Sequence, residues 1–162
     1  MPISETPSWL ITKIELRPNT IIVIADDSDI IHQIWRNKLR NHRKVKSVIY
    51  IDSLKELEDF VTKTMFSEAK TRYEEKTTRN ETGHGAGCDE GKILYIIDNH
   101  FKDRYFSGTF DSGVMLIERY HLEKQAILCT GQALRDGELA YECKILGIKL
   151  LPKEFVSLIE VV

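Results

Sequence analysis

Acidic, hydroxyl and basic side chains follow four of the apolar runs in this chain. Asp26 and Asp27 follow the first run, and Asp98 follows the third. Clustered carboxylates repel one another unless a cation offsets their charge, and an all-oxygen ligand set favours Mg²⁺. Beside such an ion, the Asp98 carboxylate can attack phosphorus in line and form an acyl phosphate. Thr130 and Lys153, at the ends of the fourth and fifth runs, can contact the remaining phosphoryl oxygens.

Five short, largely apolar runs predict strands; they cover residues 20–25, 46–51, 93–97, 125–129 and 148–151. The first of them, residues 20–25, is continuously apolar, which is typical of a strand buried on both faces of a parallel sheet. Helical periodicity separates the five runs, over residues 28–43, 53–65, 112–120 and 134–146. This alternation predicts an α/β fold, a flavodoxin-like doubly wound parallel sheet of five strands with order 2-1-3-4-5 and helices on both faces. Because the carboxyl ends of its strands share one edge, that sheet would gather Asp26, Asp27, Asp98, Thr130 and Lys153.

Two segments lie outside this alternation. Residues 1–18 are predicted to form an N-terminal arm or connecting segment before a domain over residues 19–162. Apolar and polar residues alternate over residues 9–16, which also fits an extra strand. Residues 67–92 are charged and then rich in glycine, which indicates an insertion that has little to bury.

Composition argues against several functional classes. With 23 Lys and Arg against 25 Asp and Glu, the formal net charge of −2 is unlike that of a nucleic-acid-binding domain. No apolar run reaches the length of a membrane span, so we expect no membrane insertion. The three cysteines have neither disulfide-framework nor zinc-site spacing, which fits a protein of the reducing cytoplasm.

Four short stretches together resemble the signatures of response-regulator receiver domains of two-component signalling systems. In order, they are Ile24-Ala25-Asp26-Asp27-Ser28, Tyr95-Ile96-Ile97-Asp98, Leu128-Cys129-Thr130-Gly131 and Leu151-Pro152-Lys153-Glu154-Phe155. The resemblance covers roughly residues 19–155. The stretch from Asp26 to Trp35 is further similar to receiver-like domains at the C-terminus of bacterial sensor histidine kinases.

The resemblance implies a function in a phosphorelay. Asp98 would accept a phosphoryl group from a sensor histidine kinase, in cis or in trans, with Mg²⁺ as cofactor. Thr130 would be the switch hydroxyl and Lys153 would pair with the phosphate. The metal ligands would be Asp26, Asp27, Asp98 and the backbone carbonyl of His100. The domain would catalyse its own phosphotransfer and dephosphorylation, alone or within a hybrid kinase, and a homo-oligomer is compatible with this function.

Three features depart from the receiver pattern. Glu154 follows Lys153 where the family usually has proline, and Leu150 replaces the aromatic switch residue. Only nine residues follow Lys153, so we expect the final helix to be shortened or absent. These departures favour an alternative function, a pseudo-receiver that binds a protein partner without being phosphorylated.

Each of these residues also has a simpler interpretation. Asp26 and Asp27 could cap the following helix, Thr130 could cap another, and Lys153 alone would most often be a solvated surface lysine. A third function, a phosphohydrolase with an aspartate nucleophile, is indicated by the Asp-x-Asp pattern of Asp27 and Asp29. The further acidic pair that such enzymes carry after their lysine is missing, which argues against this function.

Overall fold

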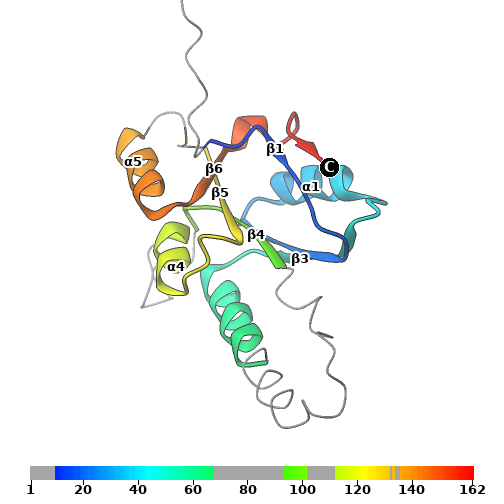
Figure 1. The fold of residues 1–162 in the computed structure, drawn as a ribbon, viewed down its shortest axis with the longest axis horizontal. Coiled ribbons are helices and arrows are strands. Elements are labelled where there is room, and N and C mark those ends of the chain that lie inside the picture. Colours follow the sequence, from blue (N-terminus) through cyan, green and yellow to red (C-terminus); the bar gives the residue numbers. More distant parts are fainter. Residues whose placement is uncertain (1–9, 68–92, 102–111, 132, 134–135) are drawn as a thin grey trace, which may run out of the picture.

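The computed structural model describes residues 10–67, 93–101, 112–131, 133 and 136–162. Except for residue 67, the predicted insertion over residues 67–92 lies outside the described residues, as do residues 1–9. The described chain has an α/β fold built around a five-stranded parallel sheet (Figure 1).

The five strands of this sheet are those predicted from the apolar runs, with ends that differ by at most one residue. They are β2 (Thr20–Ala25), β3 (Val45–Ile51), β4 (Ile93–Ile97), β5 (Ala126–Thr130) and β6 (Lys149–Pro152). Their order across the sheet is β3-β2-β4-β5-β6, and each neighbouring pair is parallel. Since a short strand, β1, precedes β2, this order reads 2-1-3-4-5 when strands are counted from Thr20.

Side-chain caps determine where the helices of the described chain begin. These helices are α1 (Asp29–Leu39), a helix over residues 54–67, α4 (Gly113–Arg119) and α5 (Gly137–Leu146). The Ser53 hydroxyl accepts the Glu56 N–H at 3.1 Å, which provides the predicted cap of the second helix. Gly147 ends α5 with a φ of 76°, in the left-handed conformation expected of a C-terminal cap.

The predicted end of the first helix, near residue 43, is wrong. α1 ends at Leu39, because Arg40 leaves the helical conformation and Asn41 has a φ of 59°. Asparagine adopts the left-handed region more readily than most residues, so it reverses the chain here. The predicted start of the last helix, residues 134–135, lies outside the described part of the chain.

Alternate residues of the strands build two cores, one on each face of the sheet. On one face, Val23 and Ala25 pack with the helix over residues 54–67, α4 and α5. On the other, Ile22 and Ile24 pack against α1, whose Trp35 is completely buried. Helices therefore cover both faces of the sheet, as predicted (Figure 1).

The two ends of the described chain pair with each other. This pairing involves the segment after Lys153, where the final helix was expected to be shortened or absent. After β6 the chain forms a 3-10 turn, η2 (Lys153–Phe155), and then β7 (Glu160–Val161). β7 pairs in parallel with β1 (Lys13–Ile14), so residues 9–16 do contain an extra strand. This pair packs on the α1 face of the sheet through Ile14 and Ile159.

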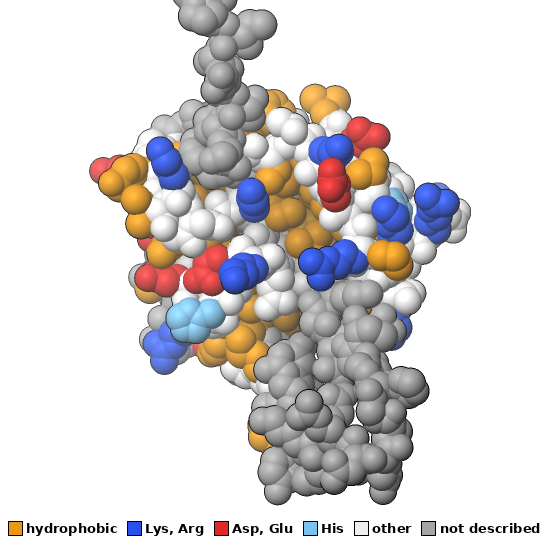
Figure 2. All heavy atoms as spheres, viewed as in Figure 1, with side chains coloured by type: hydrophobic (Ala, Val, Ile, Leu, Met, Phe, Trp, Pro, Cys, Tyr) orange, Lys and Arg blue, Asp and Glu red, His pale blue; other side chains and the backbone are white. Residues whose placement is uncertain are grey.

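The surface of the described residues carries mixed charge. Figure 2 shows Lys and Arg side chains spread among hydrophobic and acidic ones on the face seen in Figure 1, without a continuous basic stripe on the described part of that face. Within the described chain, no helix combines the length and apolar character of a membrane span.

Candidate functional site

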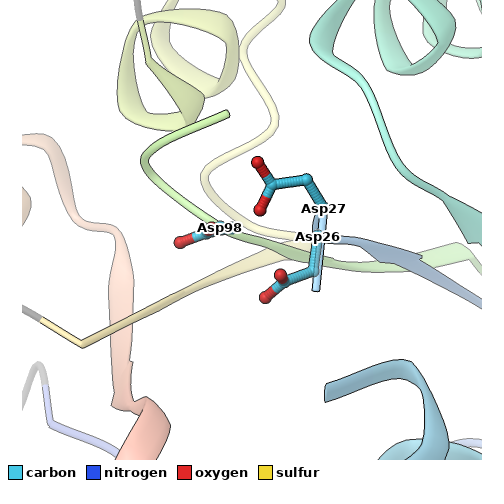
Figure 3. Close-up of side chains that lie close together, drawn as sticks. All are labelled: Asp26, Asp27 and Asp98. Carbon is cyan, nitrogen blue, oxygen red and sulfur yellow. The ribbon is translucent and has the colours of Figure 1, made fainter. Parts of the chain in front are cut away.

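Asp26 and Asp98 lie side by side just beyond the carboxyl ends of β2 and β4. The hydrogen-bond ladder continues one residue past each strand, because the Asp98 N–H donates to the Ala25 carbonyl at 2.8 Å. The Asp26 N–H likewise donates to the Ile51 carbonyl at 2.9 Å. The sheet itself therefore positions both backbones. Figure 3 shows the carboxyl groups of Asp26, Asp27 and Asp98 gathered at this rim.

The three carboxyl groups are close enough to share one cation. One ligand oxygen from each of Asp26, Asp27 and Asp98 lies within 4.8 Å of the others. Asp26 and Asp98 are buried and Asp27 is half-buried, so solvent screens their mutual repulsion only in part. Carboxylate oxygens are ligands that hard divalent cations prefer. The donor set thus fits a metal ion bound through oxygen.

Lys153 bridges two of these carboxylates. Its Nζ lies 3.0 Å from Asp26 Oδ2 and 3.0 Å from Asp98 Oδ2. The lysine side chain is 24% exposed, whereas those of Asp26 and Asp98 are almost fully buried. Burial lowers the pKa of Lys153, but Asp98 and Asp26 raise it by more, so its pKa lies above the ordinary value. The ammonium group is therefore a permanent charge partner of the site at neutral pH.

One ammonium does not offset all of the acidic charge. Burial raises the pKa of Asp98 most strongly, Asp26 raises it further, and Lys153 lowers it, which leaves a pKa of about 6. The carboxylate is therefore ionised at neutral pH and still unfavourably buried. A second cation at the rim would relieve this cost.

Two backbone N–H groups orient the carboxylates. The Ser28 N–H donates to Asp26 Oδ1 at 2.8 Å, and the Asn99 N–H donates to Asp98 Oδ1 at 2.8 Å. Each Asp thus has one oxygen held by the backbone and the other held by Lys153.

Comparisons with protein-family models, curated proteins and solved structures found no match to this chain. The chemistry of the rim is therefore inferred from its own residues.

Thr130 lies at the same edge of the sheet. It is the last residue of β5, is 1% exposed, and pairs across the ladder with Pro152, the residue before Lys153. All five residues whose types and positions predicted a site therefore lie at one edge of the sheet. His100 lies two residues after Asp98 and is exposed, and the role of its carbonyl as a metal ligand stays a prediction.

Other residues cap the helices α1 and α5, and Lys153 does not lie free on the surface. Ser28, and neither Asp26 nor Asp27, caps α1, with its hydroxyl accepting the Ile31 N–H at 3.4 Å. Asp136, not Thr130, caps α5. Lys153 is mostly buried between two carboxylates instead of lying on the surface.

The phosphohydrolase pattern has less structural support. Its second acidic residue, Asp29, is exposed in the first turn of α1. The group of acidic residues that could hold a metal contains Asp27 but not Asp29. An acidic residue in a first helical turn is accounted for by its favourable interaction with the helix dipole.

Two residues of the site were not predicted from the sequence. Asn99 is 6% exposed, and its side-chain Oδ1 accepts the Val114 N–H of α4 at 3.1 Å. A Cβ atom on Gly113 would lie 2.1 Å from the Asp98 carbonyl oxygen, so only glycine fits there. The sequence offered two signals for these residues: an Asn directly after the candidate nucleophile and a Gly directly after Ser112. Neither signal shows which residue the Asn or the Gly contacts.

Proposed function

We propose that this chain is a receiver domain in which Asp98 accepts a phosphoryl group from a sensor histidine kinase. The observation that carries this proposal is the convergence of Asp26, Asp27, Asp98 and Lys153 at the carboxyl edge of a parallel sheet, with Thr130 on the neighbouring strand. Ligands of open α/β sheets bind at this edge, next to the point where the strand order reverses. The order β3-β2-β4-β5-β6 reverses beside β2 and β4, which carry the acidic residues.

In the proposed reaction, an oxygen of Asp98 attacks the phosphorus atom of a phosphohistidine. The O–P bond forms as the N–P bond breaks, and the leaving imidazole takes up a proton from water. Lys153, which lies 3.0 Å from Asp98 Oδ2, turns to the transferred phosphoryl oxygens as that carboxylate becomes an acyl phosphate. The Thr130 hydroxyl contacts the same group. The Asn99 N–H keeps the carboxylate oriented for attack, with 2.8 Å between donor and acceptor.

The proposed cofactor is Mg²⁺, held by Asp26, Asp27 and Asp98 together with the carbonyl of His100. Bound there, the ion neutralises the phosphoryl oxygens that approach the carboxylates. The three-carboxylate donor set supports this choice, because Mg²⁺ binds through a few carboxylates and retained waters.

In the same proposal the fold is flavodoxin-like and the protein acts in the cytoplasm, where histidine kinases present their phosphohistidine.

The experiment that tests the proposal is intact-mass analysis after incubation with acetyl phosphate and Mg²⁺. We expect a gain of one phosphoryl mass in wild-type protein, and no gain in Asp98→Asn or when EDTA replaces Mg²⁺. Asp59→Asn, which removes an exposed carboxylate on the helix over residues 54–67, is the matched control and should be phosphorylated like wild type. A phosphoryl group that persists on Asp98→Asn would contradict the assignment of the acceptor.

A second function is favoured by the ion pairs of Lys153. Because this lysine already contacts Asp26 and Asp98, both at 3.0 Å, the acidic rim is partly neutralised by the protein itself. A pseudo-receiver binds a protein partner without phosphorylation, so the Lys153 ion pairs would be enough to neutralise its rim and it would need no metal ion. If wild-type protein gains no phosphoryl group and binds no beryllofluoride in the presence of Mg²⁺, this second function replaces the first.

A further inference from the structure

Asn99 connects the candidate phosphoacceptor directly to a helix. Its N–H donates to Asp98 Oδ1 at 2.8 Å, while its side-chain Oδ1 accepts the Val114 N–H at 3.1 Å. Its carbonyl oxygen accepts the Gly113 N–H at 3.0 Å. Gly113 and Val114 are the first two residues of α4. One buried residue therefore holds the carboxylate on one side and the start of α4 on the other.

The packing at Gly113 makes this connection stiff. Since a Cβ atom there would lie 2.1 Å from the Asp98 carbonyl oxygen, α4 begins in direct contact with the backbone of the acceptor. The other end of α4 is also attached, because the Tyr120 hydroxyl donates to Glu58 Oε2 at 3.0 Å. Glu58 lies on the helix over residues 54–67. A shift of the Asp98 backbone would therefore displace α4, and through it the neighbouring helix.

We propose that Asn99 is a positioning residue that couples the state of Asp98 to α4. This inference rests on the proposed function and concerns the regulation of the same site. When Asp98 Oδ1 is drawn toward a cation or a phosphoryl group, its bond with the Asn99 N–H changes. The peptide that follows Asp98 then moves, and the two hydrogen bonds from α4 move with it. Leu150, which stands where the receiver pattern has an aromatic switch residue, is completely buried and aliphatic.

The coupling can be measured as amide hydrogen exchange at Val114, followed by NMR with and without beryllofluoride and Mg²⁺. In wild-type protein we expect the exchange rate of Val114 to change when beryllofluoride binds. Asn99→Leu removes the acceptor at similar size, so Val114 should exchange about fivefold faster at rest, the fold-change that one hydrogen bond supplies. The response of Val114 exchange to beryllofluoride should then be smaller than in wild type, because only the backbone bond from Gly113 to the Asn99 carbonyl remains.

Two further variants separate coupling from simple loosening of the helix. Ser112→Ala removes the N-terminal cap of α4, because the Ser112 hydroxyl accepts the Met115 N–H at 3.4 Å. This substitution leaves the hydrogen bonds of Asp98 unchanged. In this variant the Val114 amide should exchange faster at rest, and its exchange should still respond to beryllofluoride. Asn99→Asp keeps an acceptor oxygen and should restore the response. Equal behaviour of Asn99→Leu and Ser112→Ala, or a full response in Asn99→Leu, would overturn the proposal.

One arm of the experiment does not depend on phosphorylation. Asp98→Ala removes the carboxylate that the Asn99 N–H contacts, and it should alter Val114 exchange more in the wild-type background than in the Asn99→Leu background. If wild-type protein binds no beryllofluoride but this dependence is found, the proposed phosphoacceptor function fails and the coupling stands. If Asp98→Ala leaves Val114 unchanged in both backgrounds, the coupling is refuted whatever the function.

Discussion

Replacing Asp98 by Asn should stabilise the protein when no divalent cation is present. The pKa of Asp98 is raised from 3.8 to about 6, mainly by burial. A carboxyl group whose pKa is higher in the folded than in the unfolded state opposes folding once it is ionised. At pH 7 that difference corresponds to about 3 kcal/mol. Asparagine avoids this cost but interacts less strongly with Lys153, so we expect a net gain of about 1–3 kcal/mol.

The pH dependence gives this prediction its sign. Below about pH 3 the carboxyl group is protonated in both the folded and the unfolded state, and wild type loses nothing by burying it. As the pH rises from about 4 to about 6, the unfolded state ionises first, so wild type loses stability relative to Asp98→Asn. The advantage of the variant should be small at pH 4, about half its full size at pH 5, and complete at pH 7.

The assay is urea unfolding in EDTA at these three pH values, supported by thermal unfolding. For a chain of this length, the expected gain corresponds to roughly 2–12 °C in Tm. Asp59→Asn, an exposed carboxylate on the helix over residues 54–67, should change stability by no more than about 0.5 kcal/mol at any pH. An Asp98→Asn protein that is less stable than wild type at pH 7, or equally more stable at all three pH values, would refute the electrostatic reasoning.

Three further predictions address other parts of the site. Lys153→Met, measured by urea unfolding in EDTA, should lower stability by about 3 kcal/mol because two buried carboxylates lose their partner; Mg²⁺ should recover part of the loss. Gly113→Ala should lower stability by about 1–3 kcal/mol, since its methyl group would meet the Asp98 carbonyl at 2.1 Å, whereas Gly137→Ala, with open space around it, should not. Asp27→Asn should raise the Mg²⁺ concentration for half-maximal phosphorylation by acetyl phosphate about tenfold or more.

The sheet was predictable because its strands are short, largely apolar runs, which can be recognised in the sequence without knowing which strands they pair with. Residues 93–97 illustrate this, since every position of the run is apolar and both faces of β4 are covered. The pairing of β1 with β7 was not predictable, because each strand has two residues and its partner is more than a hundred positions away. The end of α1 depended on the backbone of Asn41, which apolar periodicity does not report.

The candidate site was predictable to the extent that it consists of strand ends. Parallel strands align their carboxyl ends, so Asp26, Asp98 and Lys153 could be placed at one edge without knowing any contact between them. The sequence did not show which charged groups pair with each other or how the pKa of each group is shifted. The bridging position of Lys153 and the raised pKa of Asp98 follow from burial, which only the packed structure defines. Asn99 was missed because its role depends on where α4 docks.

The chain departs most from the expected pattern on the face that does not contact α4. There, β1, η2 and β7 pack beside α1, and the Lys38 ammonium donates to the Ile159 carbonyl at 2.8 Å. Lys153 keeps its place because β6 pairs with β5 through Pro152, one residue before it. The acidic rim therefore depends on the sheet and not on the segment that follows it. In the described chain, the segment after Lys153 pairs with β1 instead of forming a helix, and the carboxylates of Asp26 and Asp98 still meet at the Lys153 ammonium.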